Sequence, residues 1–130
     1  TSDTDMQHAW QYANQGRRER AAQICREMIS KNPLDAEPHY LMALLAQERG
    51  SFAEAKKLLK KVIYLDSLFI AAYLDLGDLY ERDGEDARVC KMRTTARDLL
   101  KALPGDSHVN FYGAATVSAL LQYVENQLSA

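Results

Sequence analysis

Apolar and polar positions along the chain follow a helical rather than a strand period. The longest apolar run, VIYLDSLFIAAYLDLGDLY at 62–80, contains one glycine and no proline. Three aspartates interrupt it, and each charge near a bilayer centre costs about 2.5–3.5 kcal/mol, which argues against a membrane span. The repeat described next indicates instead that this run is a junction between two helices.

Three columns of residues recur at a spacing of 34 positions. They hold Gly16, Gly50 and Gly84, then Ala9, Ala43 and Gly77, then Ala21, Ala55 and Val89. A glycine after an amphipathic run suits the left-handed residue that ends a helix. Small residues inside a helix let two helices cross closely. Each repeat is therefore predicted to be a helix, a glycine turn and a second helix, with repeats at about 2–35, 36–69 and 70–103.

The boundaries between repeats are marked unevenly. Pro33 separates the first repeat from the second, whereas Ser67 stands at the matching place before the third, where we expect it to cap the next helix. The stretch ALPGDSH then breaks the helical pattern. A last amphipathic helix, predicted over 114–128, would cover the exposed apolar edge of the array. Against the long helix around 88–103 it is expected to bury Val117, Leu120, Leu121 and Val124.

The period and the residue pattern resemble the tetratricopeptide repeat (TPR). That family's pattern, W-x2-L-G-x2-Y with a later A-x3-F and a proline, is met best in the third repeat. The matching residues there are Tyr73, Leu76, Gly77 and Tyr80. The resemblance covers 2–103 and implies an all-α, right-handed α-α superhelix of three TPR helical hairpins plus a C-terminal capping helix. We expect one TPR domain over 1–130, with seven helices and no strand of any length.

A narrower resemblance covers 62–128. The IYLD sequence, the LGDLY helix, LP at 103–104 and a last short helix are similar to the repeat extension behind the catalytic domain in CheR-type chemotaxis receptor methyltransferases. That family usually has proline after YLD, where this chain has Ser67. The resemblance implies a parent enzyme that methylates receptor glutamates with S-adenosylmethionine, with its catalytic part upstream of Thr1. No residue of that active site is present, so this fragment is expected to have neither catalytic activity nor a cofactor.

Composition indicates a globular protein of a reducing compartment, and we expect a cytoplasmic location. Apolar residues make up 47% and charged residues 26% of the chain, with a net charge of −2. This near-neutral balance gives no general attraction to nucleic acid or anionic membrane. Cys25 and Cys90 form no CxxC motif, so a disulfide scaffold is not expected. Cys25 lies at a helix-packing position and is predicted to be a small buried hydrophobe rather than a reactive thiol.

No residue pattern typical of catalysis or metal binding is found. The glycines form neither GxGxxG nor GxxxxGK[ST], and no serine lies in a nucleophile elbow. His8, His39 and His108 lie in different parts of the chain without HExxH spacing. We therefore predict no catalytic residue and no metal site, and His39 is interpreted as a surface or groove histidine.

Charges segregate between the two helices of each repeat. First helices carry mainly acidic residues and second helices mainly arginine and lysine. In arrays of this type the first helices line a concave groove, so the groove is predicted to be acidic with apolar patches. The basic back is interpreted as a solvated face, because no aromatic residues alternate with its lysines as nucleic-acid binding would favour. By repeat phase, the predicted partner-binding residues are Met6, Trp10, Asn14, Glu37, Tyr40, Leu44, Gln47, Leu74, Asp78, Glu81 and Arg82.

The carboxylate clamp of the well-known TPR adaptors is missing. Its matching places hold Met6, Trp10, Leu41, Ala71 and Asp75. An acidic groove should instead favour an apolar segment that carries lysine or arginine, or an amphipathic helix. Two roles stay open for Trp10, which would either anchor the partner or pack within the fold.

Two functions stay open as well. The first is a protein-interaction and regulatory module of a chemoreceptor glutamate methyltransferase, whose partner would be a chemoreceptor or the parent's own methyltransferase domain. The second is a free-standing TPR adaptor or scaffold unrelated to methylation. In both, the partner is a protein or peptide, and neither nucleic acid nor direct membrane insertion is expected. An upstream methyltransferase sequence in the parent gene would separate the two.

Overall fold

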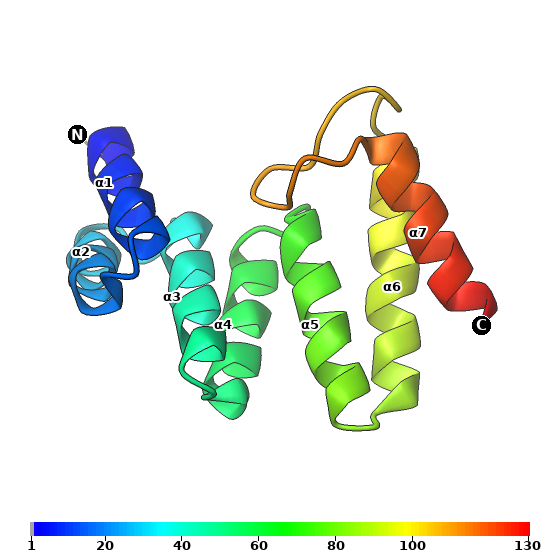
Figure 1. The fold of residues 1–130 in the computed structure, drawn as a ribbon, viewed down its shortest axis with the longest axis horizontal. Coiled ribbons are helices and arrows are strands. Elements are labelled where there is room, and N and C mark those ends of the chain that lie inside the picture. Colours follow the sequence, from blue (N-terminus) through cyan, green and yellow to red (C-terminus); the bar gives the residue numbers. More distant parts are fainter. Residues whose placement is uncertain (1) are drawn as a thin grey trace. The chain divides into compact units, whose positions relative to one another are not determined.

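The computed structural model describes residues 2–130, which form seven α-helices and, outside them, one isolated β-bridge (Figure 1). The helices are α1 Ser2–Asn14, α2 Arg18–Lys31, α3 Ala36–Glu48, α4 Phe52–Leu65, α5 Ile70–Arg82, α6 Asp86–Lys101 and α7 Val117–Ser129. An all-α fold with three helical hairpins and a C-terminal helix is therefore confirmed for these residues. None of the helices described is long and apolar enough to span a membrane.

The three hairpins, α1–α2, α3–α4 and α5–α6, close through the same turn. Gly16, Gly50 and Gly84 all lie in the left-handed region, with φ of +77°, +80° and +72°. The residue after each glycine donates its backbone N–H to the carbonyl oxygen five residues earlier, at 2.8, 2.8 and 2.9 Å. This is the hydrogen bond with which a Schellman motif ends a helix. The glycine column of the sequence is thus a column of identical helix ends.

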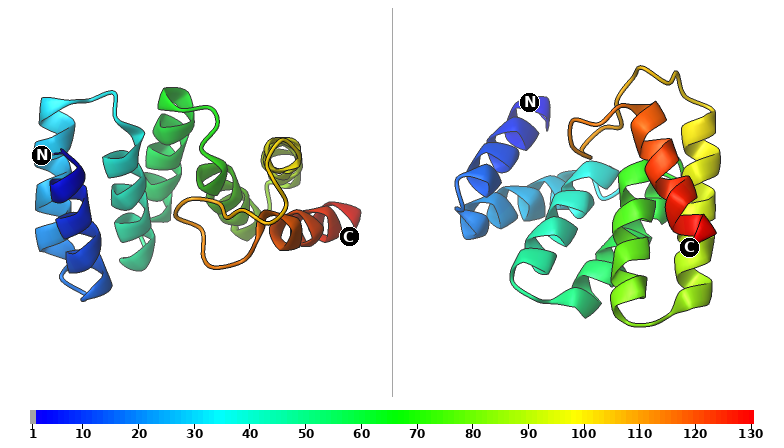
Figure 2. Two further views of the ribbon diagram at one scale, coloured as in Figure 1. Left: turned by 90° about the horizontal axis from the view of Figure 1, so that it is seen from above. Right: turned by 45° about the vertical axis from the view of Figure 1, so that its right-hand side comes forward.

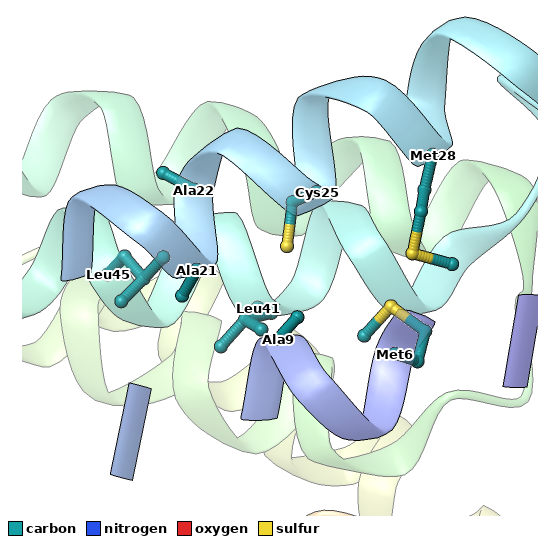
Figure 3. Close-up of a cluster of buried hydrophobic side chains, with 8 residues drawn as sticks. All are labelled: Met6, Ala9, Ala21, Ala22, Cys25, Met28, Leu41 and Leu45. Carbon is teal, nitrogen blue, oxygen red and sulfur yellow. The ribbon is translucent and has the colours of Figure 1, made fainter. Parts of the chain in front are cut away.

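The chain divides into two compact units, a first unit of residues 1–67 and a second unit of residues 68–130. In the first unit α2 packs against both α1 and α3, and α3 packs against α4. Side chains from α1, α2 and α3 converge on one apolar cluster (Figure 3). Its buried members are Met6, Ala9, Ala21, Ala22, Cys25, Met28, Leu41 and Leu45. The small residues of the repeat columns lie where these helices approach one another.

In the second unit α6 packs between α5 and α7. Helix α7 begins at Val117 rather than at 114, because Thr116 is its N-cap and accepts a hydrogen bond from the Ala119 amide at 3.2 Å. Val117, Leu120 and Val124 are buried, as predicted. Leu121 stays half-buried, which corrects the prediction. The contact stripe follows positions i, i+3 and i+7, and Leu121 lies at its margin.

The apolar run at 62–80 is a junction, as predicted, because α4 ends at Leu65 and α5 begins at Ile70. The expectation that Ser67 caps α5 is wrong. The N-cap residue is Phe69, whose side chain has no group that can accept a hydrogen bond from the helix. At the equivalent place one repeat earlier, Asp35 caps α3 by accepting from the Glu37 amide at 3.2 Å.

Between α6 and α7 runs the connecting segment, residues 102–116. An isolated antiparallel bridge joins His108 to Thr116 inside it. The Ser107 carbonyl accepts the Val117 amide at 2.8 Å, which ties the end of this loop to the start of α7. In Figures 1 and 2 the segment extends from the end of α6 toward the N-terminal end of α5 before it enters α7.

Candidate protein-interaction surfaces

Trp10 connects α1 to α3 in the first unit. Its Nε1–H donates a hydrogen bond to Glu37 Oε2 at 2.8 Å, and its ring lies 6.4 Å from the tilted ring of Tyr40. The side chain is half-buried and packs against the apolar cluster of this unit. Trp10 therefore contributes to packing within the fold and still presents part of its ring to solvent. The two roles that the sequence left open are compatible.

The other predicted partner residues of the first unit differ in accessibility. Asn14 is exposed, and Leu44 and Gln47 are half-buried. Met6 and Tyr40 are only 5% and 1% exposed, so they support the surface from beneath and offer almost no area to a partner. Repeat phase places a residue on a helix face but does not say whether the neighbouring helix covers it. Binding at this surface stays a prediction.

In the second unit, two predicted partner residues of α5 share one cation from α6. The Arg93 guanidinium contacts Asp78 Oδ1 at 3.1 Å and Glu81 Oε2 at 2.9 Å. The hydrogen bond and the charge of Arg93 lower the pKa of Glu81, and the bond to Glu81 contributes most to the raised pKa of Arg93. Much of the negative charge predicted for this part of the groove is therefore already neutralised.

Arg93 could have been found in the sequence. It stands 34 positions after Leu59 and 68 after Cys25, both of which are fully buried. A cation in an otherwise buried apolar column needs a partner, because an unpaired buried charge is costly. Arg93 itself is 5% exposed. The remaining predicted residues of α5 are Leu74, which is buried, and Arg82, which is exposed and pairs with Asp83 at 3.3 Å.

The basic side of the first unit carries a shallow depression of about 540 Å³. It is lined by His39, Glu54, Lys57, Leu58, Lys60 and Lys61. His39 lines the floor of this depression but is only 7% exposed, and its Nε2 lies 3.2 Å from the Pro33 carbonyl oxygen, so the prediction of a surface histidine is corrected to a largely buried one. This contact holds the ring beneath the turn that precedes α3. The depression follows the exposed lysines of α4.

Two further findings concern reactive groups in the described part of the chain. Cys25 is fully buried, and loss of solvation raises the pKa of its thiol to about 12. The prediction that Cys25 is buried is therefore confirmed, and its low reactivity stays a prediction. Cys90 is exposed, and both thiols are free. No group of three or more histidine, cysteine, aspartate or glutamate residues that could hold a metal ion occurs among residues 2–130.

Comparisons with known proteins agree with this architecture. Residues 12–66 match the family described as Tetratricopeptide repeat. No curated protein sequence matches the chain significantly. Among solved structures, the type III secretion translocator chaperone SycD of Yersinia enterocolitica has a TM-score of 0.74 at 15% identity, over 100% of this chain and 89% of that one.

Two other solved structures are similar. PcrH in complex with the chaperone binding region of PopD has a TM-score of 0.74 at 15% identity, over 98% of this chain and 95% of that one. MamA has a TM-score of 0.66 at 15% identity, over 98% of this chain and 65% of that one. These comparisons do not support the narrower resemblance to the CheR-type extension. The match over residues 12–66 and the similar structures therefore show that the chain has the all-α fold of TPR proteins.

Proposed function

We propose that this chain is a non-catalytic TPR module that binds a segment of a partner protein at α1 and α3, the first helices of the two hairpins in its first unit. The observation that carries the proposal is the Trp10–Glu37 pair, a half-exposed aromatic ring held by a carboxylate where α1 meets α3. Two structures of similar fold support it, since one is SycD with a peptide of the translocator YopD and the other is PcrH with the chaperone binding region of PopD.

The chemistry of this surface favours a segment with an apolar side chain next to a lysine or arginine. Trp10 offers apolar area, and a large aromatic residue is a typical interface anchor. Glu37 Oε2 already accepts the indole N–H, while its second oxygen can accept from a cationic group of the partner. In the second unit, Arg93 pairs with Asp78 and Glu81, so electrostatic attraction there is weaker.

Of the two biological settings, the free-standing adaptor or scaffold agrees better with the chaperones of similar fold. The alternative, a regulatory module of a CheR-type chemoreceptor methyltransferase, rests on the sequence resemblance alone. A cytoplasmic location belongs to both and stays a prediction. The gene sequence upstream of Thr1 decides between them, because only the methyltransferase setting requires a catalytic domain there.

The test begins with capture of the partner from an extract of the native cell, followed by titration calorimetry with the purified partner. Trp10→Phe keeps an aromatic ring but removes the N–H donor, and Glu37→Gln removes the charge. We expect each to weaken binding about tenfold, equivalent to about 1.4 kcal/mol. Tyr64→Ala, which truncates an 81% exposed ring of α4, is the matched control and should bind like the wild type. Wild-type affinity in both Trp10→Phe and Glu37→Gln would refute the proposed surface.

A further inference from the structure

Phe69 departs from the repeat at the N-cap position of α5, where the helix loses a side-chain capping hydrogen bond. The equivalent residue one repeat earlier, Asp35, caps α3 through its carboxylate. Phe69 is the N-cap residue of α5 and makes no side-chain capping bond. Phenylalanine is a poor choice for this position, because its side chain cannot accept a hydrogen bond from the first amides of the helix. The ring is therefore expected to have a different role.

Its partner in the structure is Phe111 of the connecting segment. The two rings are stacked, with centroids 5.5 Å apart and planes inclined by 12°. Phe111 has a φ of +66° and is the single non-glycine residue with positive φ in the described part of the chain. A bulky side chain in this region is strained, and such strain concentrates at functional places. The ring is also 43% exposed, which is unusual for a residue that serves only the core.

Two neighbours of Phe111 in the connecting segment are also withdrawn from solvent. Val109 is 7% exposed, and Tyr112 is half-buried. Burial raises the pKa of Tyr112 to about 12, and the negative charges of Asp75 and Asp78 add to the effect. Asp78 is one of the residues predicted to face a partner. Tyr112 is therefore close enough to Asp78 to be affected by its charge, and Phe111 stacks on Phe69 at the start of α5, so the connecting segment runs beside α5.

We propose that the connecting segment is an internal ligand of α5, and that Phe111 occupies the position of an aromatic side chain of the partner. This inference rests on the proposed function and names the partner more closely, as a peptide segment with an aromatic residue that replaces Phe111 on Phe69. A tethered segment has an effective concentration on the order of millimolar. A partner segment must therefore bind α5 tightly enough to displace the tethered connecting segment. This requirement restricts binding to segments with a well-matched aromatic residue.

The test uses the full chain with Phe111→Gly. Glycine adopts the positive φ of this position without strain, so the variant loses the ring and keeps the loop. The probe is a fluorescein-labelled peptide, GDSHVNFYGAAT, which copies residues 105–116. Fluorescence anisotropy should show the peptide binding to Phe111→Gly at least about tenfold more tightly than to the wild-type chain, because the tethered competitor is weakened. Phe111→Asn, which also tolerates positive φ, is the second variant should the glycine loosen the loop.

Three controls define the contact. The same peptide with alanine in place of its phenylalanine should show no gain. Adding Phe69→Ala to Phe111→Gly should abolish the gain, whereas Tyr123→Ala, which truncates another exposed aromatic ring of this unit, should bind like the wild type. Equal affinity of Phe111→Gly and wild type, or a gain that survives Phe69→Ala, would overturn the proposal. Either result leaves the Trp10 and Glu37 titrations untouched, because this test uses no partner protein.

Discussion

Replacing Gly77 by alanine tests the interpretation of the small-residue column. In the first two hairpins this column holds Ala9 and Ala43, both fully buried. Gly77 lies in the middle of α5 at ordinary helical φ. A Cβ added there would lie 3.5 Å from Met92 Cβ and 3.6 Å from Arg93 Cγ, which is normal van der Waals contact. The place can therefore accept one methyl group without a clash.

Two contributions favour Gly77→Ala. Alanine is better than glycine in a helix interior by about 0.8–1.0 kcal/mol. A methyl group buried without strain adds up to about 0.8 kcal/mol. Small adjustments of the Met92 and Arg93 side chains will reduce this stabilisation, so we expect the free energy of unfolding to rise by about 1 kcal/mol. Gly77→Val adds two further methyl groups beside the same neighbours and should destabilise by about 1–3 kcal/mol.

The assay is urea unfolding monitored by circular dichroism at the helical band. Wild type and variants are compared with the same dependence of the unfolding free energy on urea concentration. Gly84→Ala is the matched control, since a Cβ there meets open space but the backbone has a φ of +72°. It should destabilise by about 1 kcal/mol through the backbone alone. If Gly77→Ala destabilised the protein while Gly77→Val was no worse, the spacing of α5 and α6 would not limit this position and the reasoning would fail.

Three further predictions concern the second unit and the two thiols. Leu120→Ala should lower the free energy of unfolding by about 2–5 kcal/mol in the same urea assay, because the side chain is 5% exposed; a loss below about 0.5 kcal/mol would show that α7 is dispensable. Arg93 lowers the pKa of Glu81 from its ordinary value of 4.5. The ion pair of ionised Glu81 therefore stabilises the fold at pH values above 4.5, and this stabilisation is lost as the pH falls through the lowered pKa. Glu81→Gln should therefore flatten the acid side of a stability curve measured from about pH 6 to about pH 3. Iodoacetamide at neutral pH should label exposed Cys90 and spare Cys25, whose pKa is about 12. Mass spectrometry of the protein labelled in its native state measures this, and labelling of Cys25 would contradict the prediction.

The helical hairpins could be predicted because their signals are local and repeated. Glycine ends a helix wherever it follows an amphipathic run, and the period of 34 residues tells which runs belong together. The start of α7 and the cap of α5 were missed because they depend on single side chains. Thr116 is the N-cap of α7, whereas the prediction began the helix among the residues that precede it. Ser67 lies two residues before the actual N-cap of α5, Phe69.

The candidate surfaces could be predicted only in outline. Repeat phase brought Trp10 and Glu37 to the same side, and the structure joins them by a hydrogen bond. It did not reveal that Tyr40 is covered, since burial depends on how closely α1 approaches α3. Nor did it reveal that Arg93 reaches Asp78 across the hairpin, because that contact depends on the register of α6 against α5.

The identical turns at the three hairpin glycines make the length of this fold adjustable. Each turn is completed by hydrogen bonds within its own hairpin, and therefore needs no neighbour to specify it. A block of 34 residues copied from one hairpin glycine to the next would carry a complete helix end at each side. Gene duplication or protein engineering can thus add whole hairpins, whereas one or two residues inserted inside a helix would rotate the buried positions that follow within that helix away from the core.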